Sequence, residues 1–307
     1  MTGRASQRSS PESRALTWTR LSARALAQQR WVCLLVVVIV ALLSGLLAAW
    51  PRLDQAAKAD QVRYRIADSS AIGRDVAATV SAQSVLYGTT AGGPGLSEAE
   101  IWEAFDAEIA ALREARDAPL RSVLGQADRV AVTIKEFEPA VNPDVDVRSP
   151  SLALAGDPDL ADRVTLSQGG WPQAPQWDAG STPTTGAPGE ARPDFQVEIL
   201  VLEETAQRLG LTLGEPVRVP TTYVDMSLVL VGTYTVDDLT DPYWGHISAA
   251  AAPSVVEDLN AGTAVAGIGY TAADGWWRTL QATQESAEVR VWLDVDPDAL
   301  DGVDPAL

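Results

Sequence analysis

Residues 31–50 read WVCLLVVVIVALLSGLLAAW and contain no charged side chain. As an α-helix rising about 1.5 Å per residue, this segment is about 30 Å long, which matches the hydrocarbon thickness of a membrane. A tryptophan stands at each end, where indole rings prefer the membrane interface. Pro51 follows directly and predicts a break or kink. The segment therefore predicts one transmembrane helix.

The alternatives to an uncleaved anchor are a buried core helix and a cleaved signal peptide. An uninterrupted, uncharged run of this length is unusual for a core helix. The apolar region is also unusually long for a signal peptide, and the nearest cleavage pattern of small residues, at 57–59, lies well beyond its end. Both observations favour the anchor.

Charge is distributed unevenly on the two sides of this segment. The 307-residue chain has a formal net charge of −18, but residues 1–30 hold six arginines and one acid, so this head carries +5 and the remainder −23. The head suits the anionic inner face of a cell membrane, and residues 15–30 predict either an amphipathic helix on that face or a solvated tail.

The orientation of the segment follows from the acidic remainder. Basic residues are equally frequent just before and just after the segment, so the positive-inside rule leaves the orientation open. A short basic head and a large acidic body favour a cytoplasmic N-terminus and an extracytoplasmic domain on a single-pass protein of the cell membrane. An acidic body also repels phosphate, so no nucleic acid partner is expected.

Helices and strands are mixed after the membrane segment. Residues 53–67 predict a helical continuation of it, and the alternation over 75–84 predicts a half-buried strand. Ser97 and Glu100 form a capping box for a helix that ends near Pro119. The apolar face of this helix carries Ile101, Phe105, Ile109 and Leu112.

Strands predominate farther along the chain. Residues 168–194 are rich in Gly, Pro, Ser and Thr and predict a long loop that holds Trp171 and Trp177. The sequence EETAQRLG predicts a short helix that Gly210 caps. The predicted strands lie at 129–137, 195–201, 215–219, 226–234 and 288–293. Because these elements follow no regular βαβ rhythm, the sequence predicts an α+β fold class.

Motifs for catalysis and cofactor binding are absent from the sequence. It contains neither a G-x-x-x-x-G-K-[ST] phosphate-binding loop nor a G-x-S-x-G nucleophile elbow. Cys33, the only cysteine, lies in the apolar segment, which excludes a disulfide within the chain and a thiol nucleophile. His246, the only histidine, would need a partner to act as a base, and a plain loop residue is the simpler interpretation. We therefore expect no enzyme activity, and no catalytic, cofactor-binding or metal-binding residues.

Three groups of mainly acidic residues need an interpretation: Asp294, Asp296 and Asp298; Asn142, Asp144 and Asp146; and Asp237, Asp238 and Asp241. The first has the D-x-D-x-D spacing that opens a calcium loop, but Ala299 and Pro305 stand where glycine and glutamate are required. Solvated acidic loops are therefore expected for the first two groups, and a turn for the third.

Four segments share an informative order and spacing. LSARALAQQR (21–30) leads into the apolar segment, and RDVAATV (74–80) follows the expected stalk. VEILVLEETAQRLGLTLGEPVRV (197–219) combines a strand, a short helix and the pattern L-G-L-x-x-G-[DE]-x-V. LVLVGTYTVDDLTDPYW (228–244) combines an apolar strand, V-G-x-Y and an aspartate-rich turn. Over most of its length the chain thus resembles an FtsX-like (MacB-type) ABC transporter permease.

The resemblance implies an extracytoplasmic domain of two lobes. The membrane-proximal α/β lobe is expected at 51–148 and 237–307, with a smaller β-rich lobe inserted at 149–236. The resemblance also implies a role in ATP-driven export or in mechanical transmission across the membrane, with a separate ABC-type ATPase.

Such permeases have four transmembrane helices, and this sequence has one apolar segment of that length. The chain is therefore expected to be truncated before its remaining helices, and to bind the ATPase only where those helices are supplied. The alternative is a free-standing single-pass membrane protein whose outer domain is a binding or adaptor module.

Overall fold

The computed structural model describes residues 30–82, 98–140, 145–176, 192–258, 260, 262–296 and 299. The chain divides into two compact units. The first contains the N-terminal residues through Tyr64, and the second comprises Arg65–Asp301.

The described part of the first unit is one long helix, α2 (Arg30–Asp68), whose last four residues belong to the second unit. Its most apolar stretch has a mean hydropathy of 3.1 and no buried residue, so α2 is long and apolar enough to cross a membrane. The predicted helical continuation over 53–67 is confirmed. Of the break or kink predicted at Pro51, a break is excluded, because α2 runs through this residue. Proline removes one helical hydrogen bond, and the neighbouring turns keep theirs.

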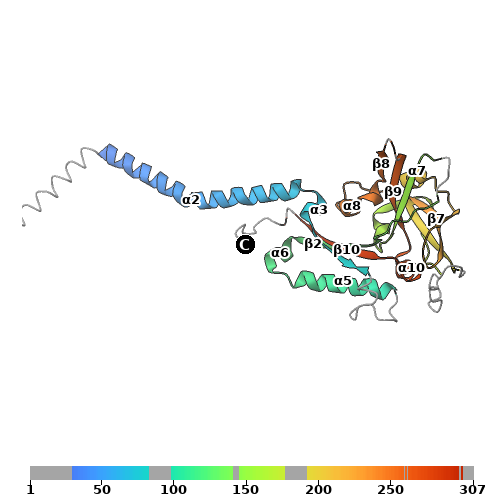
Figure 1. The fold of residues 1–307 in the computed structure, drawn as a ribbon. Coiled ribbons are helices and arrows are strands. Elements are labelled where there is room, and N and C mark those ends of the chain that lie inside the picture. Colours follow the sequence, from blue (N-terminus) through green and yellow to red (C-terminus); the bar gives the residue numbers. More distant parts are fainter. Residues whose placement is uncertain are drawn as a thin grey trace, which may run out of the picture. The chain divides into compact units, whose positions relative to one another are not determined.

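The second unit is built on one mixed sheet (Figure 1). Among the described residues the sheet has ten strands in the order β1-β10-β2-β3-β9-β5-β7-β4, with β6 beside β7 and β8 beside β9. The pairs β3–β9 and β5–β7 are parallel, and the other pairs are antiparallel. The strands are β1 (Val76–Ser81), β2 (Leu124–Thr133), β3 (Ser149–Gly156), β4 (Val164–Gly169), β5 (Asp194–Leu202), β6 (Pro216–Val219), β7 (Asp225–Val236), β8 (Ser254–Asp258), β9 (Gly262–Tyr270) and β10 (Ala287–Val295).

Helices cover both faces of the sheet. Alternate residues of β5 enter two different hydrophobic clusters, Val197 and Ile199 on one face and Leu200 and Leu202 on the other. The first cluster includes α5 (Glu98–Glu114), α7 (Glu203–Leu209) and α10 (Trp276–Thr283). The second includes the 3-10 turn η1 (Leu160–Asp162), α8 (Tyr243–His246) and α9 (Ser248–Ala251). The remaining short helices are α3 (Ala71–Arg74), α6 (Ala118–Val123) and η2 (Ala273–Gly275).

The predicted combination of one N-terminal apolar helix and a mixed α/β domain is confirmed in this form. The strands at 195–201, 215–219, 226–234 and 288–293 are present as β5, β6, β7 and β10. The short helix is α7, and Gly210 caps it in the left-handed conformation at φ 63°. Strands from 149–236 and from the flanking sequence pair within the same sheet. The two-lobed layout and its boundaries stay predictions.

Several predicted details are wrong. The predicted half-buried strand β1 is exposed on both faces, with Val76 49% and Val80 39% exposed. The helix predicted to end near Pro119 ends at Glu114, and Pro119 lies in the first turn of α6, where a missing N–H costs no helical bond. Leu112, expected on the buried face of α5, is 51% exposed. The loop expected over 168–194 is shorter at both ends, since β4 runs to Gly169 and β5 starts at Asp194. Ser97 and Trp177 lie outside the described residues.

A close contact between backbones fixes how β4 meets β7. The pairing of these strands shifts register between Leu166 and Gln168. A Cβ atom on Gly232 of β7 would lie 2.4 Å from the carbonyl oxygen of Gly170. Since this neighbour is backbone, it cannot move aside as a flexible side chain would, and only glycine fits at Gly232.

Replacement of Gly232 by alanine tests this contact. We expect Gly232→Ala to lower the free energy of unfolding by about 1–3 kcal/mol, because the added methyl group overpacks the junction of β4 and β7. Gly170→Ala is the matched control, since no atom lies within 4 Å of its Cβ position. Urea unfolding of the full chain in detergent measures both. Equal effects of the two substitutions would contradict the close-contact explanation.

Candidate functional site

The carboxylate of Asp75 joins three segments that are distant in sequence. Asp75 stands between α3 and β1, and its side chain is 0% exposed. It accepts hydrogen bonds from Arg74 Nε at 2.9 Å and from the backbone N–H of Val295 at 3.2 Å, and its second oxygen lies 2.9 Å from His246 Nε2. We call Asp75, Arg74, His246, Trp292 and Val295 the junction cluster.

His246 is a buried member of this cluster. Its side chain is 6% exposed, and its ring stacks on Trp292 with centroids 4.5 Å apart and planes at 15°. The backbone carbonyl of His246 accepts a hydrogen bond from Arg290. The interpretation of His246 as a plain loop residue is therefore wrong. The missing partner is Asp75, which lies 171 residues away, so no local pattern could have identified it.

Hydrogen bonds decide the ionisation of Asp75. Burial by itself would raise the pKa of this carboxyl group, but the hydrogen bonds from His246, Arg74 and Val295 outweigh it and hold the pKa below its usual value. Asp75 is therefore an anion at neutral pH. A buried anion with three partners stabilises the fold, and it becomes costly if one partner is lost.

Asp294 lies close to the junction cluster and has a different environment. It belongs to β10, so the solvated loop expected at 294–298 is wrong for this residue. Burial, and then the charges of Asp75 and Asp128, raise the pKa of Asp294 to about 6. Its Oδ1 atom is buried without a hydrogen-bond partner among the described residues. Asp298 lies outside those residues.

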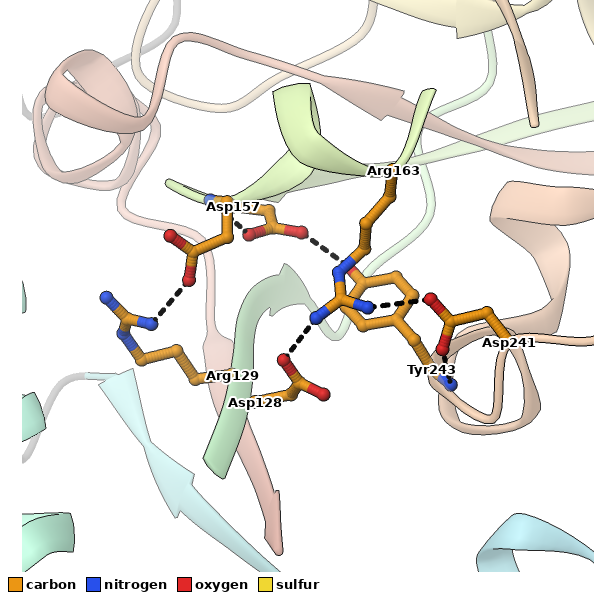
Figure 2. Close-up of polar contacts among 7 residues, drawn as sticks. Asp128, Arg129, Asp157, Arg163, Asp241 and Tyr243 are labelled. Carbon is orange, nitrogen blue, oxygen red and sulfur yellow. Dashed lines mark hydrogen bonds and ion pairs between the residues drawn. The ribbon is translucent and has the colours of Figure 1, made fainter. Parts of the chain in front are cut away.

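Arg163 is the centre of a second cluster, which we call the arginine network (Figure 2). Its guanidinium group forms ion pairs with Asp128 of β2 and, at 2.8 Å, with Asp241. It also lies 4.3 Å above the ring centre of Tyr243. The Tyr243 hydroxyl donates to Asp157, whose other oxygen accepts the backbone N–H of Asp159 at 2.8 Å.

Arg129 extends the network on the opposite side, as Figure 2 shows. Its two terminal nitrogens contact Asp159 at 2.8 Å and Asp106 at 2.7 Å. Each arginine thus binds two carboxylates. The network links α5, β2, η1 and α8, because its members come from these elements or from the residues next to them.

The aspartates at 237–241 confirm the predicted turn and add an ion pair that was not predicted. Asp238 accepts hydrogen bonds from the backbone and hydroxyl of Thr240, and Asp241 accepts the N–H of Tyr243. The other oxygen of Asp241 binds Arg163. Of the group at 142–146, Asp146 is exposed, and Asn142 and Asp144 lie outside the described residues.

Both clusters contain groups used in acid–base chemistry, and they differ in access to cavities: Asp106, Arg129 and Asp157 of the arginine network line a cavity of about 480 Å³. His246 and Asp75 line neither this cavity nor the cavity of about 1090 Å³ in the described part of the second unit. Within the described ranges, no three side chains of His, Cys, Asp or Glu are placed to hold a metal ion. The junction cluster links α3, α8 and β10, and the arginine network links α5, β2, η1 and α8.

A double-mutant cycle measures the bond between Asp75 and His246. We expect Asp75→Asn to cost about 2–4 kcal/mol of unfolding free energy, because it removes the charge from a buried, hydrogen-bonded pair. With His246→Ala as the second substitution, the coupling energy should be about 1–3 kcal/mol. Asp146→Asn, an exposed control, should change little. Additive effects of the two substitutions would show that the pair contributes no coupling.

The buried carboxyl group of Asp157 predicts a pH dependence. Burial raises its pKa to about 6, although the bonds from Tyr243 and the Asp159 amide oppose this. The folded state therefore holds a proton that the unfolded state releases at lower pH, and stability falls as pH rises through this window. Relative to the unsubstituted chain, Asp157→Asn should gain about 2–3 kcal/mol of unfolding free energy between pH 4 and pH 7.

Urea unfolding at several pH values checks this expectation for Asp157. The difference between Asp146→Asn and the unsubstituted chain should stay constant over the same range. A constant difference for Asp157→Asn as well would contradict a raised pKa.

Comparison of the chain with protein-family models found no match. Comparisons with curated proteins and with solved structures also found none. The resemblance to FtsX-like permeases stays a prediction from the sequence.

Proposed function

We propose that the chain is the N-terminal, mainly extracytoplasmic portion of an FtsX-like ABC transporter permease. In this role it acts in ATP-driven export or in mechanical transmission across the cell membrane, together with a separate ATPase. Its N-terminus is cytoplasmic, α2 crosses the membrane, and the mixed α/β unit lies outside. The observation that carries the proposal is the junction cluster, where the segment that follows α2 is bonded to α8 and to the end of β10.

The connection from α2 to Asp75 is short, and hydrogen bonds order its two ends. Ser69 donates its hydroxyl to the carbonyl of Arg65 at 2.7 Å and its N–H to the carbonyl of Ile66. The N–H groups of Gly73 and Arg74 bind the carbonyl of Ser70. The N–H of Asp75 binds the carbonyl of Ala71. Because α2 ends at Asp68 and α3 ends one residue before Asp75, few residues separate the helix from the junction cluster, which supports the proposed transmission.

Asp75 is bonded to two residues beyond its own segment. One is His246 in α8, the helix that also carries Tyr243 of the arginine network. The other is Val295 at the end of β10, a strand between β1 and β2. The junction cluster thus connects the segment after α2 with α8 and with β10, which supports a role in mechanical transmission.

The test of this proposal adds three membrane helices of the kind that such permeases have. The 307 residues offer an ATPase only the thirty-residue head, which is small compared with the ~1,200 Å² of a stable interface. The chain alone should bind the ATPase weakly. With three further transmembrane helices supplied in cis or as a second polypeptide, it should co-purify with the ATPase and change the rate of ATP hydrolysis.

A substitution in the junction cluster separates an effect on mechanical transmission from an effect on assembly with the ATPase. In the supplemented complex, Asp75→Asn should leave co-purification unchanged and weaken the effect on ATP hydrolysis, whereas Asp146→Asn should change neither. Near-stoichiometric binding of the ATPase to the chain alone would contradict the dependence on further helices. If no ATPase binds in either form, the free-standing binding or adaptor module is the better assignment.

A further inference from the structure

A cavity of about 480 Å³ lies beside the Arg129 end of the arginine network. Its walls come from α5, from η1, from the segment after β4 and from the turn at η2. The principal lining residues are Trp102, Glu103, Arg129, Leu160, Trp171 and Asp274. The volume falls within the range of about 300–1,000 Å³ that small-molecule sites occupy.

The aromatic walls of this cavity are fixed by contacts of their own. Trp102 donates its indole N–H to the carbonyl of Ala273 at 3.1 Å. Hydrogen bonds hold the chain on both sides of Trp171. The N–H of Gly170 donates to the carbonyl of Val231, and the N–H of Gln173 donates to the carboxylate of Glu198. The Trp171 side chain is nevertheless 43% exposed. An indole surface is therefore available to a ligand without rearrangement of the chain.

A glycine contact anchors the same segment a second time. A Cβ atom on Gly275 of η2 would lie 2.4 Å from Cδ of Pro175. Pro175 is buried there, four residues after Trp171. The segment after β4 and the turn at η2, which both contribute lining residues to the cavity, are thus packed against each other.

The charges of the lining favour a positive ligand. Arg129 is its only basic residue, and Asp106 and Asp159 already bind both of its terminal nitrogens. Glu103 and Asp274 are exposed at the cavity, and within the described residues their carboxylates have no ion-pair or side-chain hydrogen-bond partner. A concave site with surplus negative charge concentrates cations. The occupied guanidinium leaves little attraction for an anion.

We propose that this cavity binds a small organic cation, an ammonium group on an apolar body. The ammonium lies between the carboxylates of Glu103 and Asp274 and the face of Trp171, where the π electrons attract a cation. The apolar body rests on the buried side chains of Leu160 and Leu200 at the base of the cavity. This inference concerns a ligand of the outer domain and does not depend on the permease assignment.

Three probes separate the charge of the ligand from its apolar surface. Benzyltrimethylammonium carries both features, choline carries the charge, and 3,3-dimethylbutanol is the uncharged isostere of choline. Calorimetric titration of the full chain in zwitterionic lipid nanodiscs should rank their affinities in that order. We expect at least about tenfold between choline and its isostere, which corresponds to a cation–π contact reinforced by carboxylates.

Variants assign this binding to the cavity. Trp171→Ala should weaken benzyltrimethylammonium binding by about tenfold or more, and Trp171→Phe should retain most of it. Glu103→Gln combined with Asp274→Asn should weaken binding and reduce its dependence on salt. The matched control combines Glu257→Gln with Asp146→Asn, which makes the same change in charge at exposed sites away from the cavity.

Three outcomes would overturn the proposal. The first is the absence of saturable benzyltrimethylammonium binding. The second is equal affinity for choline and its isostere. The third is equal weakening by the cavity variants and by the control pair. Circular dichroism of each variant verifies that the fold is retained, and the substituted side chains are exposed, so loss of structure is not expected.

Discussion

The buried carboxylate of Asp75 is the interaction on which the organisation of the second unit depends. A fully buried charge is stable only with enough donors around it, and here the donors come from α3, α8 and the end of β10. These three segments must therefore be in place together. The stacking of His246 on Trp292 adds a packing constraint to the electrostatic one, because it fixes the plane of the ring that faces Asp75.

Four aspartates of the unit, Asp106, Asp128, Asp159 and Asp241, are gathered around two arginines. Arg163 and Arg129 each bind two carboxylates, which offsets the repulsion between aspartates brought together by the fold. The two arginines stabilise the ionised forms of Asp157 and Asp294 less strongly, and burial raises the pKa of each to about 6. The large negative charge of the chain is thus partly an internal property, and it makes stability sensitive to pH near neutrality.

Local patterns were sufficient for some elements and not for others. The alternation in β5 and the glycine cap after α7 are encoded within a few residues, and both could be predicted. The strands β3 and β9 were missed because their sequences are rich in alanine and glycine, which favour strands weakly. Tertiary packing explains that composition: a Cβ atom on Gly267 would lie 2.4 Å from Cγ2 of Thr205. The pairing of Asp75 with His246 was beyond prediction for a related reason, since 171 residues separate the partners.

The exposed strand β1 has a practical consequence for handling the protein. It is the last strand of the described sheet, it pairs only with β10 there, and its sequence VAATVS contains neither a charge nor a proline. Natural sheets usually place such residues on their outer strands to prevent contact with other extended chains. Nothing within β1 supplies that protection, so concentrated samples will tend to associate edge to edge. A single lysine at Thr79 would supply the missing repulsion and keep the protein dispersed.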